Sequence, residues 1–178
     1  MLDTPALITD RLQLRRLEEN DLPALVRYAN NRTIADRVLN IPFPYRQLDA
    51  MLRLGKVRQG FQQRTHFSFA IIHLEAAELI GEIGLHPLPN NTQGQVAYWI
   101  AEPYWGQGLA TEAVQAVLSF GFQQLHLQLI YGECKRDNLA SVRVLEKNKM
   151  QAVGTGRSVE QYFIKQEDWE ERGDTEQE

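Results

Sequence analysis

The spacing of hydrophobic and polar positions in the first part of the chain predicts one strand followed by two helices. Residues 12–15 alternate apolar and polar side chains, which is typical of a half-buried strand. Residues 22–29 carry apolar side chains three and four positions apart, and Asn20 and Asp21 before them are common helix N-caps. Residues 47–63 show a second helical pattern after an interruption that contains two prolines.

The rest of the chain alternates predicted strands with predicted helices. Strands are expected at residues 66–72, 79–85, 96–100, 127–133 and 153–164. Helices are expected at residues 111–125 and 139–147, where the apolar positions return to helical spacing. The predicted order is strand, two helices, three strands, helix, strand, helix, strand. Such an order indicates one mixed α/β sheet with helices on its faces.

The composition fits one ordinary globular domain. The chain has 178 residues, of which 43% are hydrophobic and 24% are charged. We therefore expect a single domain over residues 1–178, with a flexible acidic tail at about residues 170–178.

Charge and cysteine usage exclude several classes of partner. The net charge of -4 without a block of like charges argues against a wide nucleic-acid-binding face. The N-terminus lacks a signal-peptide pattern, and no apolar run has membrane-spanning length. Cys134 is the one cysteine, which fits a reducing compartment. The sequence thus predicts a cytoplasmic protein without a nucleic-acid or membrane partner.

Its four histidines are scattered and no metal-ligand motif occurs, so no metal site is expected.

The segment YWGQGLATE places Gly106, Gly108 and Ala110 where the helix at residues 111–125 is about to begin. The unmatched amides and the dipole at a helix N-terminus attract a phosphate, and small residues let it approach. This loop lacks the Gly-Lys-Ser/Thr ending of a P-loop and the third glycine of a dinucleotide fingerprint, because Thr111 stands there. It matches the acetyl-CoA loop pattern x-x-x-G-x-G/A over WGQGLA.

Together with other segments, this loop gives the chain its resemblance to the GNAT superfamily of acyl-CoA N-acyltransferases. The chain most resembles the branch that contains the ribosomal-protein alanine N-acetyltransferases. The matching segments are ITDRLQLRRL, LIGEIGL, VAYWIAEPYWGQGLATEAV and CKRDNLASVRVLEKNKM, in an ordered set that extends over residues 7–169. The resemblance implies a single-domain α/β fold with a mixed, mostly antiparallel sheet, a splayed strand pair and helices on both faces.

The resemblance also implies which residues bind acetyl-CoA, the expected co-substrate. The residues expected along the pantetheine arm are Ile100, Ala101, Glu102 and Asn138. Those expected around the pyrophosphate are Gln107, Gly108, Leu109, Ala110 and Thr111. Arg143 and Lys147 are candidates for contact with the CoA phosphates, although a solvated helix face explains them equally well.

The chemistry is the attack of a neutral amine on a thioester, without a covalent enzyme intermediate. Many family members carry a tyrosine acid seven residues after the helix asparagine, and here that position is Leu145. The related branch offers a serine instead, which is Ser141 here; its alternative role is a backbone contact in the first helical turn. Alignment without gaps from Asn138 places the base at Glu160.

The base has alternatives. The position where many family members carry a glutamate is Gln95, and an amide cannot act as a base. Glu82, His86 and water remain as other candidates. The aromatic residues Phe67, Phe69, Tyr98 and Trp99 are interpreted as core; the alternative is that one or two of them line an acceptor pocket.

The sequence therefore predicts an acetyl-CoA-dependent N-acetyltransferase that acts as a monomer or a homodimer. Its acceptor is a primary amine, either a protein N-terminus (for example of a ribosomal protein) or a small molecule. A non-catalytic CoA-binding sensor on the same fold is the alternative, which Gln95 and Leu145 motivate. A nucleotide-binding oxidoreductase is the third possibility, and the missing third glycine argues against it.

Overall fold

The computed structural model describes residues 6–38, 41–90, 92–153 and 159–170, and in them eight strands form one sheet. The strands are β1 (Leu7–Ile8), β2 (Leu12–Arg16), β3 (Phe67–His73), β4 (Glu78–Pro87), β5 (Gln93–Ile100), β6 (Leu129–Lys135), β7 (Gln151–Ala152) and β8 (Val159–Lys165). Their order in the sheet is β1-β2-β3-β4-β5-β6-β8-β7. The pair β5–β6 is parallel, and the other described pairs are antiparallel. The expected mixed, mostly antiparallel sheet is confirmed.

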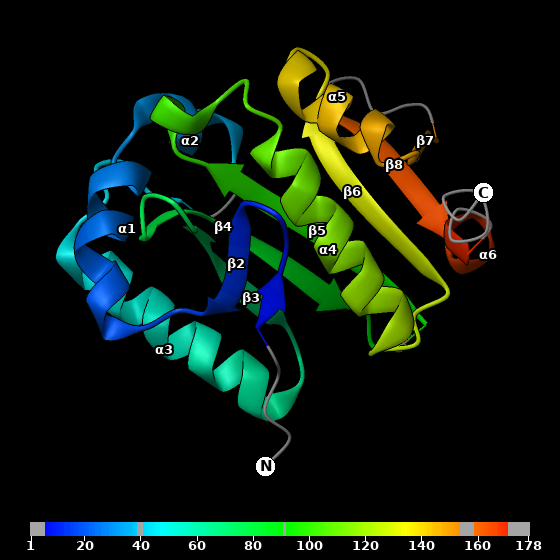
Figure 1. Cartoon of the computed structure of the whole chain (residues 1–178), viewed down its shortest axis with the longest axis horizontal. Coiled ribbons are helices and arrows are strands. Elements are labelled where there is room, and N and C mark those ends of the chain that lie inside the picture. Colours follow the sequence, from blue (N-terminus) through cyan, green and yellow to red (C-terminus); the bar gives the residue numbers. More distant parts are fainter. Residues whose placement is uncertain (1–5, 39–40, 91, 154–158, 171–178) are drawn as a thin grey trace.

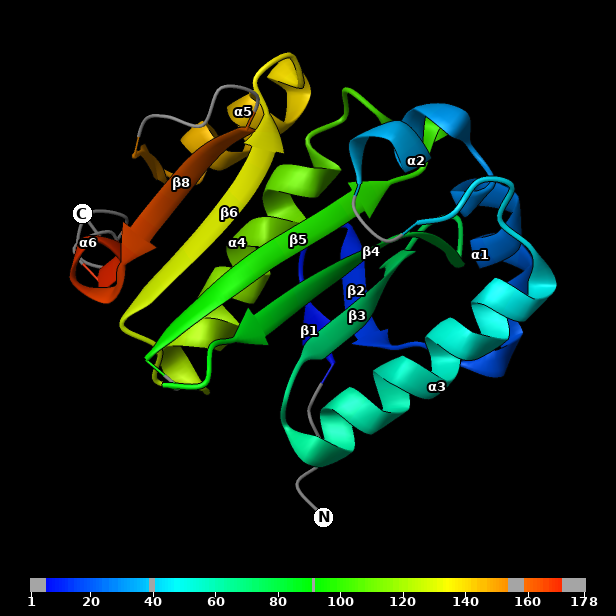
Figure 2. The same ribbon diagram turned by 180° about the vertical axis from the view of Figure 1, so that it is seen from behind.

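Helices cover both faces of this sheet. They are α1 (Leu22–Ala29), α2 (Arg32–Arg37), α3 (Gln47–Gln63), α4 (Leu109–Gln123), α5 (Leu139–Lys147) and α6 (Gln166–Glu170), with short 3-10 turns η1 (Glu19–Asp21) and η2 (Glu102–Tyr104). Figure 1 shows α4 and α5 in front of the sheet. Figure 2 shows α3 on the opposite face, and α1 packs against both α3 and β4. Within the described residues, we find no helix with the length and apolar content that crossing a bilayer requires.

The core lies where β3 and β4 are covered from both sides, which is why most residues of these strands are buried. From α4, the stripe of Ala113, Val114, Val117 and Leu118 is fully buried against the sheet. Aromatic rings join α3 to α4 through β3: Phe61 and Phe120 each contact Phe67 and Phe69 in edge-to-face geometry. These contacts fix α4, and with it the glycine loop at its N-terminus.

The structure bears out most predicted elements and differs from the sequence analysis at particular places. The helices at 47–63 and 139–147 have the predicted bounds, whereas α4 begins at Leu109, two residues before the predicted start. Neither β1 nor α2 was predicted. The short helix α2 depends on its cap, because the Asn31 side chain accepts hydrogen bonds from the amides of Thr33 (2.9 Å) and Ile34 (3.2 Å).

The end of the chain differs as well. The strand region predicted at 153–164 is replaced by β7 and β8, and residues 154–158 between them lie outside the described part. The short helix α6 follows β8 without a predicted counterpart. Most of the predicted tail, from residue 171 onward, also lies outside the described residues.

The parallel strands β5 and β6 separate along their length. Their described pairing extends from Gln93↔Leu129 to Val96↔Gly132, while β5 stays paired with β4 as far as Ile100↔Gly81 and β6 stays paired with β8. Figure 2 shows the two strands diverging toward α2 and α5. The splayed strand pair expected from the sequence is thus confirmed.

Gly81 on β4 is required by the close approach of β5. A Cβ at this position would overlap the carbonyl oxygen of Trp99 and lie 3.1 Å from Cα of Ile100. We expect Gly81→Ala to lower the free energy of unfolding by about 2 kcal/mol, because backbone atoms cannot move aside as a side-chain end can. Urea-induced unfolding measures this change.

Gly55 on α3 provides the matched control. A Cβ there meets no atom within 4 Å, so Gly55→Ala should raise the unfolding free energy by about 0.5–1 kcal/mol through helix propensity. Equal effects of the two substitutions would contradict the packing assigned to Gly81.

Candidate functional site

The glycine loop connects η2 to α4, and its two glycines have left-handed backbone conformations. Gly106 has φ of 76° and Gly108, the N-cap of α4, has φ of 78°. A Cβ on Gly106 would meet no protein atom within 4 Å, and one on Gly108 would meet Nη2 of Arg11 at 3.6 Å. Backbone conformation therefore already requires glycine at both positions, independently of any ligand that approaches the loop.

The start of α4 presents unmatched amides beside this loop. The first hydrogen bond of the helix runs from the Glu112 amide to the Gly108 carbonyl at 3.2 Å. The amides of Leu109, Ala110 and Thr111 precede that bond and have no place in the helical ladder. Together with the dipole of a fifteen-residue helix, they make this end electropositive.

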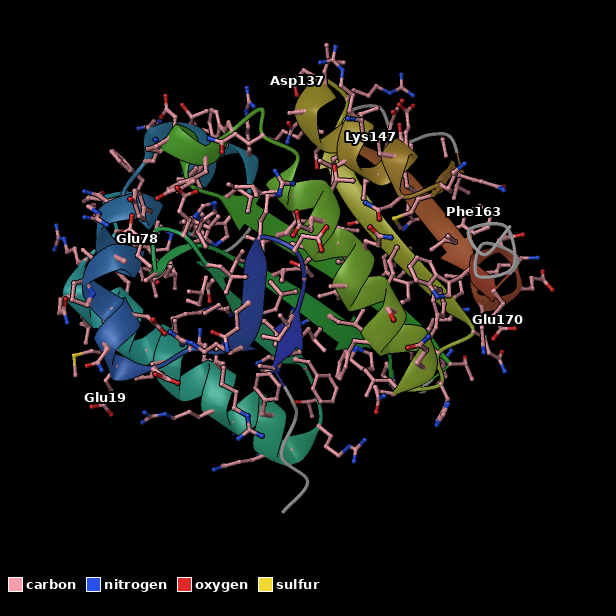
Figure 3. The ribbon with its side chains drawn as sticks, viewed as in Figure 1. Glu19, Glu78, Asp137, Lys147, Phe163 and Glu170 are labelled. Atoms are coloured by element: carbon pink, nitrogen blue, oxygen red, sulfur yellow. The ribbon has the colours of Figure 1, made fainter. Side chains whose placement is uncertain are left out.

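A cavity of about 340 Å³ opens at the glycine loop, and we call it the loop cavity. Its walls come from the end of β5, the loop itself, the first turn of α4, and residues of α2 and α5. The charged side chains among its described lining residues are Arg37, Arg143 and Lys147, all of them cations. Figure 3 labels Lys147 on α5, on the side of the molecule that carries α4. In a chain of net charge -4, a cavity lined by cations is suited to an anion.

Most residues predicted to bind the cofactor line this cavity. They are Ile100, Gly108, Leu109, Ala110, Thr111, Asn138 and Arg143. The other three have different surroundings. Ala101 is fully buried and donates its amide to the Ile80 carbonyl at 2.7 Å. The Glu102 carboxylate accepts a 2.6 Å hydrogen bond from Asn31, and the Gln107 side chain donates to the Pro103 carbonyl at 3.3 Å.

Trp105 occupies the first position of the loop and closes the end of β5. Its indole Nε1 donates to the carbonyl oxygen of Ile100 at 2.6 Å, and the ring lines the loop cavity. Since Ala101 bonds to β4, strand alternation turns the backbone amides of Tyr98 and Ile100 toward the gap between β5 and β6.

Asn148 was not identified from the sequence and joins the two helices that frame the loop cavity. It is buried, and its Nδ2 donates to the carbonyls of Thr111 (3.2 Å) and Val144 (2.9 Å). The end of α5 is thereby held against the first turn of α4. In the sequence an asparagine after a helix looks like an ordinary C-cap, so its contact with α4 gives no signal.

A second cavity, of about 360 Å³, lies over β4 and β5, and we call it the strand cavity. Every second residue of the two strands faces this cavity and forms its floor. These residues are Glu82, Gly84 and His86 of β4 and Gln95, Ala97 and Trp99 of β5. The small pair Gly84–Ala97 forms the middle of this floor. Its other walls come from α1, α3, α5, β6 and the segment that joins α2 to α3.

The two cavities meet at the gap between β5 and β6. Six residues line both: Arg37, Val38, Tyr98, Trp99, Asn138 and Ser141. At this junction the hydroxyl groups of Tyr98 and Ser141 lie 2.8 Å apart, within hydrogen-bond distance. Asn138 caps α5 by accepting from the Ser141 amide at 3.3 Å, which holds Ser141 at the junction.

Tyr98 is a strand aromatic that the sequence assigns to the core, with an acceptor-pocket lining as the alternative. The structure favours the alternative, because its hydroxyl reaches the junction of the cavities. Burial raises the pKa of Tyr98 well above its usual value, so the phenol keeps its proton at physiological pH. Tyr98 lies two residues beyond Val96, the last residue of β5 that pairs with β6. The sequence does not reveal where that pairing ends, so it could not place Tyr98 at the gap.

Leu145, which stands where the family tyrosine acid was expected, has a packing role. It is buried and lines the strand cavity. Its Cδ2 lies 3.2 Å, and Cγ1 of Val96 lies 3.3 Å, from the place a Cβ on Gly132 would take. Since Val96↔Gly132 is the last described pair of β5 and β6, Leu145 packs at the point where these strands separate.

The two candidate carboxylate bases have different surroundings. Glu82 is 6% exposed and lies on the floor of the strand cavity, where Nε of Arg53 (3.0 Å) and Nε1 of Trp99 (3.4 Å) donate to it. Glu160 is not among the described lining residues of either cavity.

Glu160 lies one strand away from the strand cavity, on β8. It pairs across the strands with Cys134, a buried residue that does line that cavity. Its carboxylate binds Nε of Arg136 at 3.0 Å and accepts a 3.2 Å hydrogen bond from Tyr162. Among the described residues, no group of three or more His, Cys, Asp or Glu side chains is arranged to hold a metal ion.

His86 lies at the other end of the same floor from Glu82. Burial, and then the nearby His66 and Arg53, lower the pKa of His86 from 6.5 to about 4, so its imidazole is neutral at physiological pH. The ring stacks on that of His66 at 5.7 Å between centroids. A neutral imidazole in the strand cavity can accept a hydrogen bond from a cationic amine.

The lowered pKa of His86 predicts a pH dependence of stability. The unfolded chain binds a proton at His86 near pH 6.5 and the folded chain near pH 4, so stability is lost as pH falls through this window. Between pH 7 and pH 5 we expect wild type to lose roughly 1–2 kcal/mol more than His86→Gln. Unfolding curves at the two pH values measure the difference, and parallel losses would contradict it.

Comparison with known proteins agrees with this geometry. The family model described as the acetyltransferase (GNAT) domain matches residues 11–151. An uncharacterized N-acetyltransferase, p20 of Bacillus licheniformis, is 30% identical over 156 residues, which cover 86% of each chain. The ribosomal-protein-serine acetyltransferase of Escherichia coli is 30% identical over 143 residues, 79% of each chain.

Solved structures show the same fold. The ribosomal L7/L12 alpha-N-protein acetyltransferase RimL, in complex with coenzyme A, superposes with a TM-score of 0.81 at 19% identity. The superposition covers 90% of this chain and 98% of that one.

Proposed function

The chain belongs to the GNAT acetyltransferase family and is an N-acetyltransferase, and from this premise we propose that it transfers the acetyl group of acetyl-CoA to a primary amine by direct attack in a ternary complex. The observation that carries the proposal is the meeting of two cavities at one gap in the sheet. The loop cavity is lined by cations and the strand cavity by groups of both charges. One cavity thus suits a polyphosphate and the other an amine.

The loop cavity is the proposed site of acetyl-CoA. Its pyrophosphate lies against Gly108 and the amides of Leu109, Ala110 and Thr111, and Arg143 and Lys147 supply positive charge from α5. Gln107 belongs to this group through the backbone of the loop.

The pantetheine arm extends along the end of β5, where Ile100 and Asn138 line the cavity. Ala101 and Glu102 continue β5 into the loop, and their contribution is through the backbone, because the Glu102 side chain binds Asn31. This orientation directs the thioester to the junction of the cavities.

Ser141 is the proposed acid. Its hydroxyl donates to the leaving sulfur, and Tyr98, which keeps its proton, donates to the Ser141 hydroxyl in turn. The amide of Tyr98 or Ile100, turned toward the gap, stabilises the negative charge that develops on the acetyl oxygen. Many family members carry the phenol on the helix, at the position of Leu145. Here Tyr98 supplies a phenol from strand β5 instead.

The amine enters through the strand cavity, and two carboxylates are candidates to take its proton. The position of Glu82 in that cavity supports it as the base, acting directly or through one water. The resemblance supports Glu160, which lies outside the described lining of that cavity. Each carboxylate is paired with an arginine at 3.0 Å, Glu82 with Arg53 and Glu160 with Arg136. The acceptor class is a protein N-terminus or a small amine, and the E. coli relative is named for a ribosomal protein.

Turnover tests the proposal directly. We expect thiol release from acetyl-CoA with at least one acceptor among N-terminal peptides, polyamines, aminoglycosides and amino acids. Ser141→Ala should lower kcat roughly tenfold or more while KM for acetyl-CoA changes little, because the hydroxyl acts on the leaving group. Tyr98→Phe should give a smaller loss of the same kind. CoA binding without turnover on any acceptor would favour the sensor alternative.

The base is tested by a matched pair of substitutions. Glu82→Gln should lower kcat/KM about tenfold or more near neutral pH and shift the acid limb of the pH–rate profile, while Glu160→Gln should leave that limb in place. The reverse result would assign the base to Glu160. If the acid limb stays in place in both variants, water alone accepts the proton.

A further inference from the structure

The turn between β1 and β2 packs against the glycine loop, nearly one hundred positions away in sequence. Arg11 in this turn donates from Nη1 to the carbonyl oxygen of Gln107 at 2.8 Å. Its Nε and Nη2 both bind Oε2 of Glu112, at 2.8 Å and 2.7 Å, and its backbone amide donates to Oε1 at 2.9 Å. One guanidinium therefore joins the middle of the loop to the first turn of α4.

Thr9 completes this cluster from the same turn. Its hydroxyl donates to Oε1 of Glu112 at 2.6 Å and accepts from the Leu12 amide at 3.0 Å. The Glu112 side chain is only 16% exposed, although that of Arg11 is 47% exposed. The carboxylate is thus held on two sides, and its position at the start of α4 is fixed.

Glu112 creates an electrostatic difficulty for an anion site at this helix end. Burial alone would raise the pKa of Glu112, but the hydrogen bonds from Thr9 and Arg11 outweigh it and lower the pKa below its usual value. The carboxylate is therefore ionised at neutral pH, one residue beyond the free amide of Thr111. Without Arg11 it would repel a phosphate bound at those amides.

We propose that Arg11 is a positioning residue for the pyrophosphate of acetyl-CoA, acting through the Gln107 carbonyl and the Glu112 carboxylate. The proposal rests on the proposed function. The contact with Gln107 engages that carbonyl and fixes the loop between Gly106 and Gly108, both of which have positive φ. The contact with Glu112 neutralises the carboxylate beside the amides.

The location of Arg11 also brings positive charge to the loop itself. Its Nη2 lies 3.6 Å from the place that a Cβ on Gly108 would take. The guanidinium binds the loop carbonyl through Nη1 and the carboxylate through Nε and Nη2, a rigid planar arrangement of donors that the point charge of a lysine does not provide. Within the segment ITDRLQLRRL, this gives Arg11 a role at the glycine loop rather than in its own strand pair.

The test compares two thioesters that differ in the pyrophosphate. Arg11→Gln should raise KM for acetyl-CoA about tenfold and leave kcat nearly unchanged. With acetyl-pantetheine, which lacks the pyrophosphate and the nucleotide, the same substitution should change kcat/KM by less than about twofold. A purely structural role would impair both thioesters alike, and that outcome, or an unchanged KM for acetyl-CoA, would overturn the proposal.

Two further variants separate positioning from general damage. Arg58→Gln is the control for loss of a surface arginine. Arg58 on α3 is about as exposed as Arg11 (54%) and pairs at 3.1 Å with Glu19 of η1, away from the loop. Adding Glu112→Gln to Arg11→Gln should recover part of the KM, since it removes the uncompensated charge. No recovery in a double variant that folds would overturn the electrostatic part of the proposal.

Calorimetric titration with CoA gives a readout that needs no acceptor. Wild type should bind CoA, and Arg11→Gln should bind it about tenfold more weakly at a temperature where its melting curve shows it fully folded. Absence of CoA binding by wild type would overturn the proposed function and this inference with it. Wild-type binding that Arg11→Gln leaves intact would overturn the inference alone.

Discussion

The site depends on the point where β5 and β6 stop pairing. A continuous sheet would separate the loop cavity from the strand cavity, because each lies on a different face. The described pairing ends at Val96↔Gly132, where Leu145 packs against Gly132, and the strands then diverge. Beyond that point, backbone N–H and C=O groups of β5 that would pair with β6 in a continuous sheet face the gap. The gap therefore joins the two faces and supplies the backbone groups that border the junction.

Charge is distributed unequally on the two sides of this gap. The described lining of the loop cavity carries Arg37, Arg143 and Lys147 and ends at the amides of α4. In the strand cavity Arg53 is bound to Glu82, and His86 is neutral at physiological pH. A polyanion is therefore stabilised more strongly in the loop cavity than in the strand cavity. At the loop, the Glu112 carboxylate is paired with Arg11.

The sequence predicts the fold well wherever period and capping are local. The bounds of α3 and α5 are as predicted, and the glycine loop followed from its pattern. The face predicted for α3 is wrong, because Leu48, Met51 and Leu52 are exposed and the helix is buried through Ala50, Leu54, Val57, Gly60 and Phe61. The helix α2 was missed because six residues are too short for a periodic signal and its stability comes from the Asn31 cap. The site was predicted less completely, since most of its missed contacts join distant segments. Tyr98 and Ser141 are 43 positions apart, and Arg11 and Gln107 are 96 apart.

The exchange between Leu145 and Tyr98 shows why residue types alone could not locate the phenol. A tyrosine at the position of Leu145 would have to fit where Leu145 packs beside Gly132 and Val96. In this chain Leu145 fills that space with an apolar side chain, at the point where the strands separate. The phenol comes instead from β5, two residues beyond Val96, where strand alternation and the gap leave room for it to reach Ser141. Packing at the separation point and the hydrogen bond at the junction are thus parts of one arrangement. Leu145 on α5 packs where the strands separate, and Tyr98 on β5 reaches Ser141 through the gap.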